Sequence, residues 1–245
     1  MQRFTFAVDQ GNSTTKAAIF DGSALIAFEK AAKGQESDLE QWIIKHQCMG
    51  GIVSSVRSSE AVFLGQHGGK SILWMSPNLP MPFTVNYTTP QTLGVDRLAN
   101  AAAALAQGYG PQAVIIDCGS CLTITTLFDG QLQGGSISPG LGMRFKALQT
   151  FTARLPLVEN IPLEVPLIGH STESSIQSGV ILGMLAEIEE IINAYCRKIS
   201  PLSVIITGGD AGHFVPRLKS PIFAEPFLTL MGLHEIYQYQ NLHVK

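Results

Sequence analysis

Charged residues are scarce in this chain of 245 residues, at 14%, and they nearly cancel to a net charge of −3. A nucleic-acid-binding surface needs a clustered basic excess, so we expect no nucleic-acid partner. No basic run leads into an apolar stretch at the N-terminus, and no window approaches 18 uninterrupted apolar residues. We therefore expect no signal peptide, no transmembrane helix, no membrane partner and a cytoplasmic location.

Cysteines are also few: Cys48, Cys118, Cys121 and Cys196 lack the density of a secreted disulfide scaffold, and we expect them to be reduced. The Cys118-Gly119-Ser120-Cys121 spacing leaves open a thioredoxin-like redox pair or the nucleophile segment of a papain-like protease. A redox pair has its first thiol at a helix N-terminus, whereas this one lies between two strand-like segments. The protease segment has Trp or Tyr where Leu122 stands. The six histidines show no metal-ligand spacing and no pairing typical of hydrolases.

A repeated motif stands out against this background. The segment Asp9-Gln10-Gly11-Asn12-Ser13-Thr14-Thr15-Lys16 follows an apolar run, and Asp117-Cys118-Gly119-Ser120-Cys121-Leu122-Thr123 follows another in the second half of the chain. The later turns Asp21-Gly22 and Asp129-Gly130 stand at the same distance from Asp9 and Asp117, so motif and turn keep one offset. Each copy has a buried-strand pattern, a carboxylate at the strand end, a glycine and then hydroxyls. The spacing predicts a duplicated phosphate-binding β-hairpin.

The remaining patterns predict an α/β chain of two domains, residues 1–111 and 112–245. Four prolines between Trp74 and Thr92 predict an irregular surface segment, and Gly134 to Gly140 predicts flexible backbone. Strands are expected over residues 4–20, 23–29, 51–56 and 204–206, the last running into a glycine turn. Helices are expected over residues 37–46, 98–106, 143–152, 173–198 with Thr172 as N-cap, and 229–239.

Six motifs in order resemble the type III pantothenate kinases over essentially the whole chain. They are Asp9-x-Gly11-Asn12-Ser13-x-x-Lys16, Gly94-x-Asp96-Arg97, Asp117-x-Gly119-Ser120-x-x-Thr123, Gly134-Gly135-x-Ile137-x-Pro139-Gly140, Thr172 with Ile176-x-Ser178-Gly179, and Thr207-Gly208-Gly209-Asp210-Ala211. The resemblance implies the actin, Hsp70 and sugar-kinase fold, two ribonuclease-H-like domains with ATP in the cleft between them. It implies ATP-dependent phosphorylation of pantothenate to 4'-phosphopantothenate, the first step of coenzyme A biosynthesis.

The resemblance also implies roles for individual residues. Asp96 would be the general base, Asp9 would bind Mg²⁺ directly or through water, and Asp117 would bind a monovalent cation, K⁺ or NH₄⁺. The substrate-binding residues would be Tyr87, Gly94, Val95, Asp96, Arg97 and Thr172. The ATP-binding residues would be Asp9, Gly11, Asn12, Ser13, Thr14, Thr15, Lys16, Gly119, Ser120, Gly208 and Gly209. Serine replaces the family's usual threonine at Ser13, and Ser120-Cys121 replaces Thr-Ala, from which we expect altered ATP affinity and retained activity.

Each role has a structural alternative at this stage. Lys16 and Arg97 could be solvated, Asp9 and Asp117 could end their strands, and Tyr87 could be loop packing. Thr172 could be only an N-cap, Asp96 could only cap or compensate the dipole of a helix, and Gly208-Gly209 could be a simple turn.

Two other functions also stay open. The chain could be a superfamily enzyme acting on a sugar or on phosphate chains, or a non-catalytic nucleotide-binding accessory protein. By resemblance we expect a homodimer whose substrate site lies near the subunit interface. Apolar residues of the long helix are candidates for that interface: Ile181, Leu182, Leu185, Ile188, Ile191 and Ile192.

Overall fold

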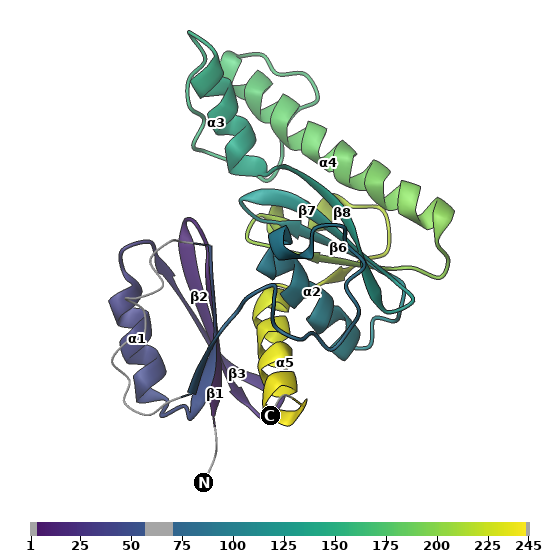
Figure 1. Ribbon diagram of the computed structural model, residues 1–245. Helices are drawn as coiled ribbons and strands as arrows, with labels where there is room; N and C mark the ends of the chain where they lie inside the picture. Colours follow the sequence, from purple (N-terminus) through teal and green to yellow (C-terminus); the bar gives the residue numbers. More distant parts are fainter. Residues whose placement is uncertain (1–3, 57–70, 244–245) are drawn as a thin grey trace. The chain divides into compact units, whose positions relative to one another are not determined.

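The computed structural model describes residues 4–56 and 71–243 (Figure 1). The chain forms two compact units, Met1–Gly108 with Phe227–Lys245, and Tyr109–Pro226. We expected a single division after residue 111, whereas these units divide after Gly108 and again after Pro226. The last helix therefore belongs to the first unit, because its apolar residues pack there.

The first unit is built on a five-stranded mixed sheet with the order β3-β2-β1-β4-β5. β1 to β3 form an antiparallel meander, while β4 and β5 lie parallel to β1. The bounds are β1 Thr5–Gln10, β2 Thr14–Asp21, β3 Ala24–Ala32, β4 Gly50–Ser55 and β5 Ser71–Trp74. The strand β5 is not predicted from the sequence, because a strand of four residues is too short to show a clear alternation of apolar and polar residues.

Helices cover both faces of this sheet. α1, Glu36–Lys45, buries Leu39 and Ile43 against one face. α2, Val95–Ala106, and α5, Leu228–His243, pack on the other, and Figure 1 shows α1 and α5 on opposite sides. Strand residues alternate between the two faces, so Phe6 and Val8 face α1 while Ala7 faces α2 and α5.

The contact between α2 and α5 is a close helix crossing. Gly232 of α5 lies directly on the backbone of α2, where an added Cβ would overlap the carbonyl oxygen of Ala99. The alanine-rich composition of α2 therefore has a packing reason beyond helix propensity, because small side chains let the two helix axes approach.

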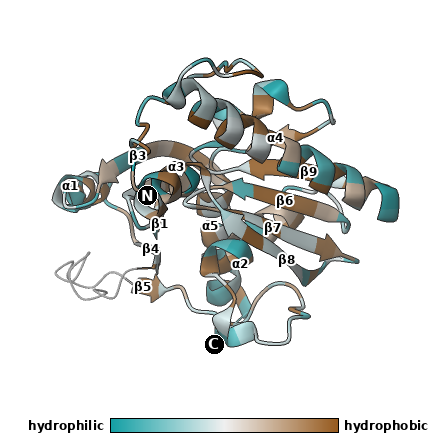
Figure 2. Cartoon of the chain, turned by 90° about the horizontal axis from the view of Figure 1, so that it is seen from above, coloured by the Kyte–Doolittle hydropathy of each residue, from teal (hydrophilic) through white to brown (hydrophobic). Residues whose placement is uncertain are grey.

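The second unit repeats the arrangement, with the strand order β10-β9-β6-β7-β8 and the same parallel and antiparallel pairings. Its strands are β6 Ala113–Cys118, β7 Cys121–Phe128, β8 Gln131–Pro139, β9 Ser203–Thr207 and β10 Phe223–Ala224. α3, Leu141–Phe151, and α4, Thr172–Lys198, cover one face of the sheet. Figure 2 shows the hydrophobic character of the central strands β6 and β9.

The difference in residue number between equivalent positions of the two hairpins is not constant: it changes at the loop between the two strands. The loop from β1 to β2 is one residue longer than the loop from β6 to β7, so the offset between the copies shortens by one after the loop. At this shorter offset the two register shifts coincide, one between Ile19 and Phe20 and the other between Thr126 and Leu127. The equal spacing of the Asp-Gly turns is therefore misleading: Asp21 is still paired in its strand, whereas Asp129 is in the turn with φ 49°.

Three expectations need correction. Gly134 to Pro139 is a paired strand, not flexible backbone, with Gly134 and Gly135 at positive φ beside the register shift. The N-cap of α4 is Ser171, not Thr172; Ser171 and Ser174 form a capping box, and the helix begins at Thr172. Half of the apolar stripe of α4 is core, because Ile181, Ile188 and Ile192 are fully buried within the second unit, whereas Leu182, Leu185 and Ile191 are half-buried.

Candidate active site

The first hairpin places Asp9 at the carboxyl end of β1. Asp9 is paired with Lys16 on β2 and with Ser54 on β4. Side chains of directly paired residues point to the same face, and here that is the face covered by α2 and α5. A carboxylate, an ammonium group and a hydroxyl therefore lie side by side across three strands.

The loop between β1 and β2 presents polar groups to solvent. Its backbone is held by a hydrogen bond from Gly11 N to Thr14 O, 3.0 Å, while Asn12, Ser13 and Thr14 are exposed. Thr15 differs, since its side chain is buried on the α1 face and donates to Glu36 Oε1 at 3.4 Å. The exposed loop residues suit an anionic ligand, and the hydroxyl of Thr15 is directed elsewhere.

The environment of Asp9 is unfavourable to a carboxylate. Burial raises the pKa of Asp9 to about 6, the charge of Lys16 opposes the rise, and the charge of Asp96 adds to it. Asp96 is therefore near enough to Asp9, within the first unit, for its charge to act on that carboxyl group. Such an environment favours a cationic partner for the carboxylates.

The start of α2 positions Asp96. Gly94 is the N-cap and Asp96 lies in the first turn, so Asp96 does not cap the helix, although the helix dipole still favours its charge. An added Cβ on Gly94 would overlap Asp96 Oδ1, so only glycine permits this carboxylate position. Arg97 is 3% exposed and held by other groups, Val95 is half-buried, and Tyr87 is half-buried in the preceding proline-rich segment.

The second unit has a matching row at the end of β6. Asp117 is paired with Thr123 on β7 and Thr207 on β9. Thr123 occupies the place that Lys16 has in the first unit, so no lysine is paired with Asp117. Gly208 has φ 99°, and a Cβ there would lie 2.5 Å from Asp117 Oδ1. Gly208 thus does more than turn the chain, because it lets backbone approach the carboxylate.

Backbone from three segments meets around the second loop. Asp210 N donates to Cys118 O at 2.9 Å, and a Cβ on Gly140 would overlap the carbonyl oxygens of Gly119 and Ser120. Gly140 closes the glycine-rich segment before α3. The sequence motifs contain both Gly140 and Asp210 but assign neither residue a role of its own. A motif shows that several glycines occur together, but it does not show that Gly140 is the one that contacts the loop at Gly119 and Ser120.

Cys118 lies in an environment that does not suit a redox or nucleophilic thiol. Burial raises the pKa of the Cys118 thiol to about 12, and the charges of Asp117 and Asp210 add to the rise. The thiolate is the reactive species, so Cys118 is unreactive at neutral pH. Cys48, Cys118, Cys121 and Cys196 are all free thiols.

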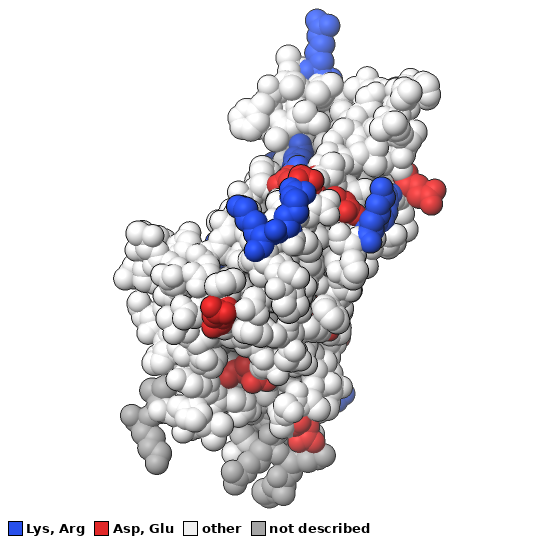
Figure 3. Space-filling view, turned by 90° about the vertical axis from the view of Figure 1, so that its right-hand side faces the viewer, with Lys and Arg blue, Asp and Glu red and all other residues white. Residues whose placement is uncertain are grey.

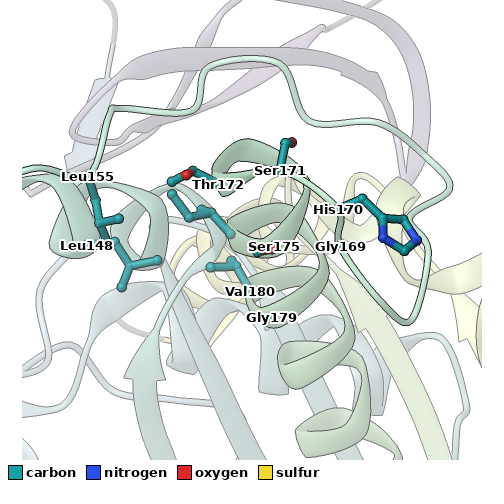
Figure 4. Close-up of a pocket in the computed structure, with 10 residues that line it drawn as sticks. Leu148, Leu155, Gly169, His170, Ser171, Thr172, Ser175, Gly179 and Val180 are labelled. Atoms are coloured by element: carbon teal, nitrogen blue, oxygen red, sulfur yellow. The ribbon is translucent and has the colours of Figure 1, made fainter.

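Thr172 lies elsewhere in the second unit, in an open pocket of about 800 Å³. Figure 4 shows Leu148 and Leu155 on one side of it and residues of the first turns of α4 on the other. Thr172 is exposed, and the capping of α4 does not use it. None of the expected ATP-binding residues lines this pocket.

Two further properties of the described residues bear on the site. Residues 4–56 and 71–243 contain no group of three or more His, Cys, Asp or Glu that could hold a metal ion, and no helix among them is long and apolar enough to cross a membrane. On the face shown in Figure 3, side chains of both charge signs are sparse among uncharged ones.

Known proteins resemble the chain along most of its length. The model of the type III pantothenate kinase family matches residues 5–194. A type III pantothenate kinase from Phocaeicola vulgatus is 40% identical over 237 residues, which cover 96% of this chain and 98% of that protein.

Two solved structures share the fold at low identity. A Campylobacter jejuni protein described as a Baf family transcriptional activator has a TM-score of 0.60 at 19% identity, covering 96% of this chain and 98% of that one. Component A of the (R)-2-hydroxyglutaryl-CoA dehydratase of Acidaminococcus fermentans has a TM-score of 0.55 at 13% identity, covering 98% of each chain.

Proposed function

The chain belongs to the type III pantothenate kinase family, and from this premise we propose that it transfers the γ-phosphate of ATP to the primary hydroxyl of pantothenate. The product is 4'-phosphopantothenate, and the reaction is the first step of coenzyme A biosynthesis. The chain has the actin, Hsp70 and sugar-kinase fold. The observation that carries the proposal is the grouping of Asp96 with Asp9 and Lys16 at one end of the first sheet.

Asp96 is the general base in this proposal. The loose transition state of phosphoryl transfer requires a positioned hydroxyl and an acceptor for its proton. Asp96 accepts the proton of the pantothenate hydroxyl as the oxygen attacks phosphorus. Arg97 pairs with the pantothenate carboxylate, and Tyr87, Gly94 and Val95 line the same site.

The first hairpin stabilises the charge on the transferred group. Lys16 supplies a fixed cation, and Gly11, Asn12, Ser13 and Thr14 supply backbone and hydroxyl donors to phosphate oxygens. Thr15 can contribute only through its backbone, since its hydroxyl bonds to Glu36. In the second unit, Gly119 and Ser120 bind phosphate, and Gly208 and Gly209 lie against adenosine.

A divalent ion fits the residues present. One half-buried carboxylate cannot hold Mg²⁺ alone, but Mg²⁺ keeps several waters and is bound by one or two carboxylates together with substrate phosphates. Asp9, whose burial calls for a cationic partner, suits an ion that arrives with ATP. When bound, Mg²⁺ would neutralise charge on the phosphates.

A monovalent cation fits the second row. The carboxylate of Asp117 lies against the backbone of Gly208 and beside the hydroxyl residues Thr123 and Thr207, all oxygen-bearing groups of the kind a hard cation prefers. We place K⁺ or NH₄⁺ there.

A homodimer in the cytoplasm completes the proposal. Exposed apolar side chains on α3 and the segment after it offer an interface in place of the buried stripe of α4: Met143, Phe151, Leu157, Leu163, Leu167 and Ile168. Thr172 borders this surface and would contact pantothenate near the interface. Light scattering should give twice the 26.4 kDa chain mass, and Phe151→Glu should lower it. A monomer mass for the active native enzyme would contradict the dimer.

The test of the reaction is formation of phosphopantothenate from ATP and pantothenate, with Mg²⁺ and either K⁺ or NH₄⁺. Asp96→Asn should lower kcat at least 100-fold, the size of a general-base contribution. Asp38→Asn is the matched control, because Asp38 is an exposed aspartate in the first turn of α1. Activity that survives in Asp96→Asn would move the base elsewhere, and no product from folded native enzyme would overturn the proposed function.

A further inference from the structure

Among the described residues, the buried hydroxyl group of Ser54 makes no hydrogen bond. Ser54 occupies the penultimate position of β4, and the residue is 1% exposed. Because a buried hydroxyl without a partner loses its bonds to water and gains none, such groups are rare and call for a reason.

The position of Ser54 supplies the reason. β4 is parallel to β1, and Ser54 is paired directly with Asp9. Lys16 is the partner of Asp9 on the other side. Neighbouring strands lie about 4.8 Å apart, so the three side chains stand in one row on one face. The orphan hydroxyl therefore belongs to the end of the sheet where Asp9 lies.

The second unit repeats this placement. Thr207 on β9 is paired with Asp117 as Ser54 is paired with Asp9, and Thr207 is 2% exposed. The chain thus has a buried hydroxyl beside the strand-end carboxylate in both halves, although the third member of the row changes from Lys16 to Thr123. A packing role alone would be served equally well by alanine or valine.

We propose that Ser54 is a positioning residue of the phosphoryl-transfer site, whose hydroxyl, with the carboxylate of Asp9, holds the hydrated Mg²⁺ that ATP brings. The inference rests on the proposed kinase function. A hydrated ion suits the pair, because a water in its shell can hydrogen-bond to the hydroxyl that has no protein partner. Lys16 contacts phosphate, so ion and phosphate are held from adjacent strands.

The experiment measures the affinity of Mg²⁺·ADP by titration calorimetry for native chain, Ser54→Ala and Ser54→Thr, with Mg²⁺ and again in EDTA. Loss of one hydrogen bond to a charged assembly should weaken Mg²⁺·ADP binding by Ser54→Ala about tenfold, and leave ADP binding in EDTA unchanged. Ser54→Thr keeps the hydroxyl and should bind within about twofold of native.

Ser55→Ala is the matched control. Ser55 is the next residue of β4 and therefore points to the opposite face, where its hydroxyl donates to Gln10 Oε1 at 2.9 Å. Removing this hydroxyl should leave the affinity of Mg²⁺·ADP unchanged. A tenfold loss in Ser55→Ala as well would overturn the inference, because the effect would then belong to the strand.

Thermal unfolding of the nucleotide-free chain gives a second readout. Ser54→Ala should unfold at the native temperature or above it, because it removes an unsatisfied group. A lower unfolding temperature, an equal loss of affinity with and without Mg²⁺, or no Mg²⁺ dependence in native chain would each overturn the inference. Native chain that binds Mg²⁺·ADP as described and yet does not phosphorylate pantothenate would overturn the proposed substrate and leave the role of Ser54 supported.

Discussion

At the scale of single residues, the candidate site lowers the stability of the fold, because it keeps the carboxylate of Asp9 in an unfavourable environment. Asp9 is ionised in an environment that raises its pKa from 3.8 to about 6, with Asp96 adding to the rise. A folded-state pKa above the unfolded value means that ionisation destabilises the fold, and that stability is regained as pH falls from about 6 toward 4. In the proposed function, a cation carried by ATP would offset this destabilisation.

Asp9→Asn should therefore separate stability from activity. At pH 7 the nucleotide-free variant should be more stable than native by about 1–3 kcal/mol, toward the lower value because the side chain stays partly exposed. Its kinase activity should fall at least 100-fold. Urea unfolding together with the kinase assay checks both. A variant less stable than native would show that Asp9 stabilises the empty site.

Gly94→Ala tests the positioning of the base. The added Cβ would overlap Asp96 Oδ1 and force the carboxylate to rotate. Because a misplacement of about 1 Å in a reacting group can cost 100-fold, we expect kcat to fall 10- to 100-fold with little change in unfolding temperature. Gly142→Ala, an exposed helical glycine with no atom near its Cβ position, should leave kcat unchanged. Equal kcat for Gly94→Ala and native would argue against Asp96 as base.

At the scale of the elements, the crossed helices α2 and α5 together cover one face of the first sheet. Leu230, Leu233 and Ile236 of α5 are fully buried there, and Gly232 meets the backbone of Ala99. Since α2 also presents Asp96, a displacement of α5 would also remove packing that supports the helix bearing the proposed base.

Gly232→Ala should be strongly destabilising. Its Cβ would overlap a backbone oxygen that cannot rotate away, so α5 has to shift, at a cost of about 2–4 kcal/mol. Gly183→Ala in α4, where the Cβ position is open, should instead stabilise by about 0.5–1 kcal/mol. Chemical denaturation of the two variants makes the comparison, and equal stabilities would show that α5 docks loosely.

At the scale of the whole molecule, stability should depend on pH through a buried histidine. His234 of α5 is 1% exposed, bonds Thr5 Oγ1 at 2.9 Å and stacks on Phe20 at 3.9 Å between ring centres. Burial lowers its pKa to about 4, from 6.5 in the unfolded chain. Between these values only the unfolded chain binds the proton, so stability rises with pH through this window and is lost as pH falls through it.

The His234 contribution to that loss should approach about 3 kcal/mol at pH 4. Urea unfolding at several pH values should show the slope in native chain and a shallower one in Thr5→Val/His234→Phe, which removes both members of the Thr5–His234 hydrogen bond and leaves Gln238 without its contact to the ring. Asp9 works in the opposite direction over much of the same range, so Asp9→Asn should steepen the slope. Identical slopes for native chain and the double variant would rule out His234 as the source.

Local sequence patterns predict most of the helices and strands and the motifs of the candidate site. Strand-end carboxylates and the start of α2 follow from neighbouring residues, and so does the duplicated hairpin. The sequence missed what depends on distant contacts: the change of offset after the first loop, the burial of Arg97 and the docking of α5 in the first unit. The sequence gives no reason to single out Ser54, because a serine near the end of a strand carries no signal until its pairing with Asp9 is known.

The discontinuous first unit has a consequence for synthesis. Residues 227–243 are made only after the ribosome has produced all of the second unit, so the second unit can fold while the first still lacks α5. Until then the apolar face of β1, β2 and β4 and the small side chains of α2 have no cover from this helix. The nascent chain should therefore bind chaperones through its N-terminal half longest, although that half is made first.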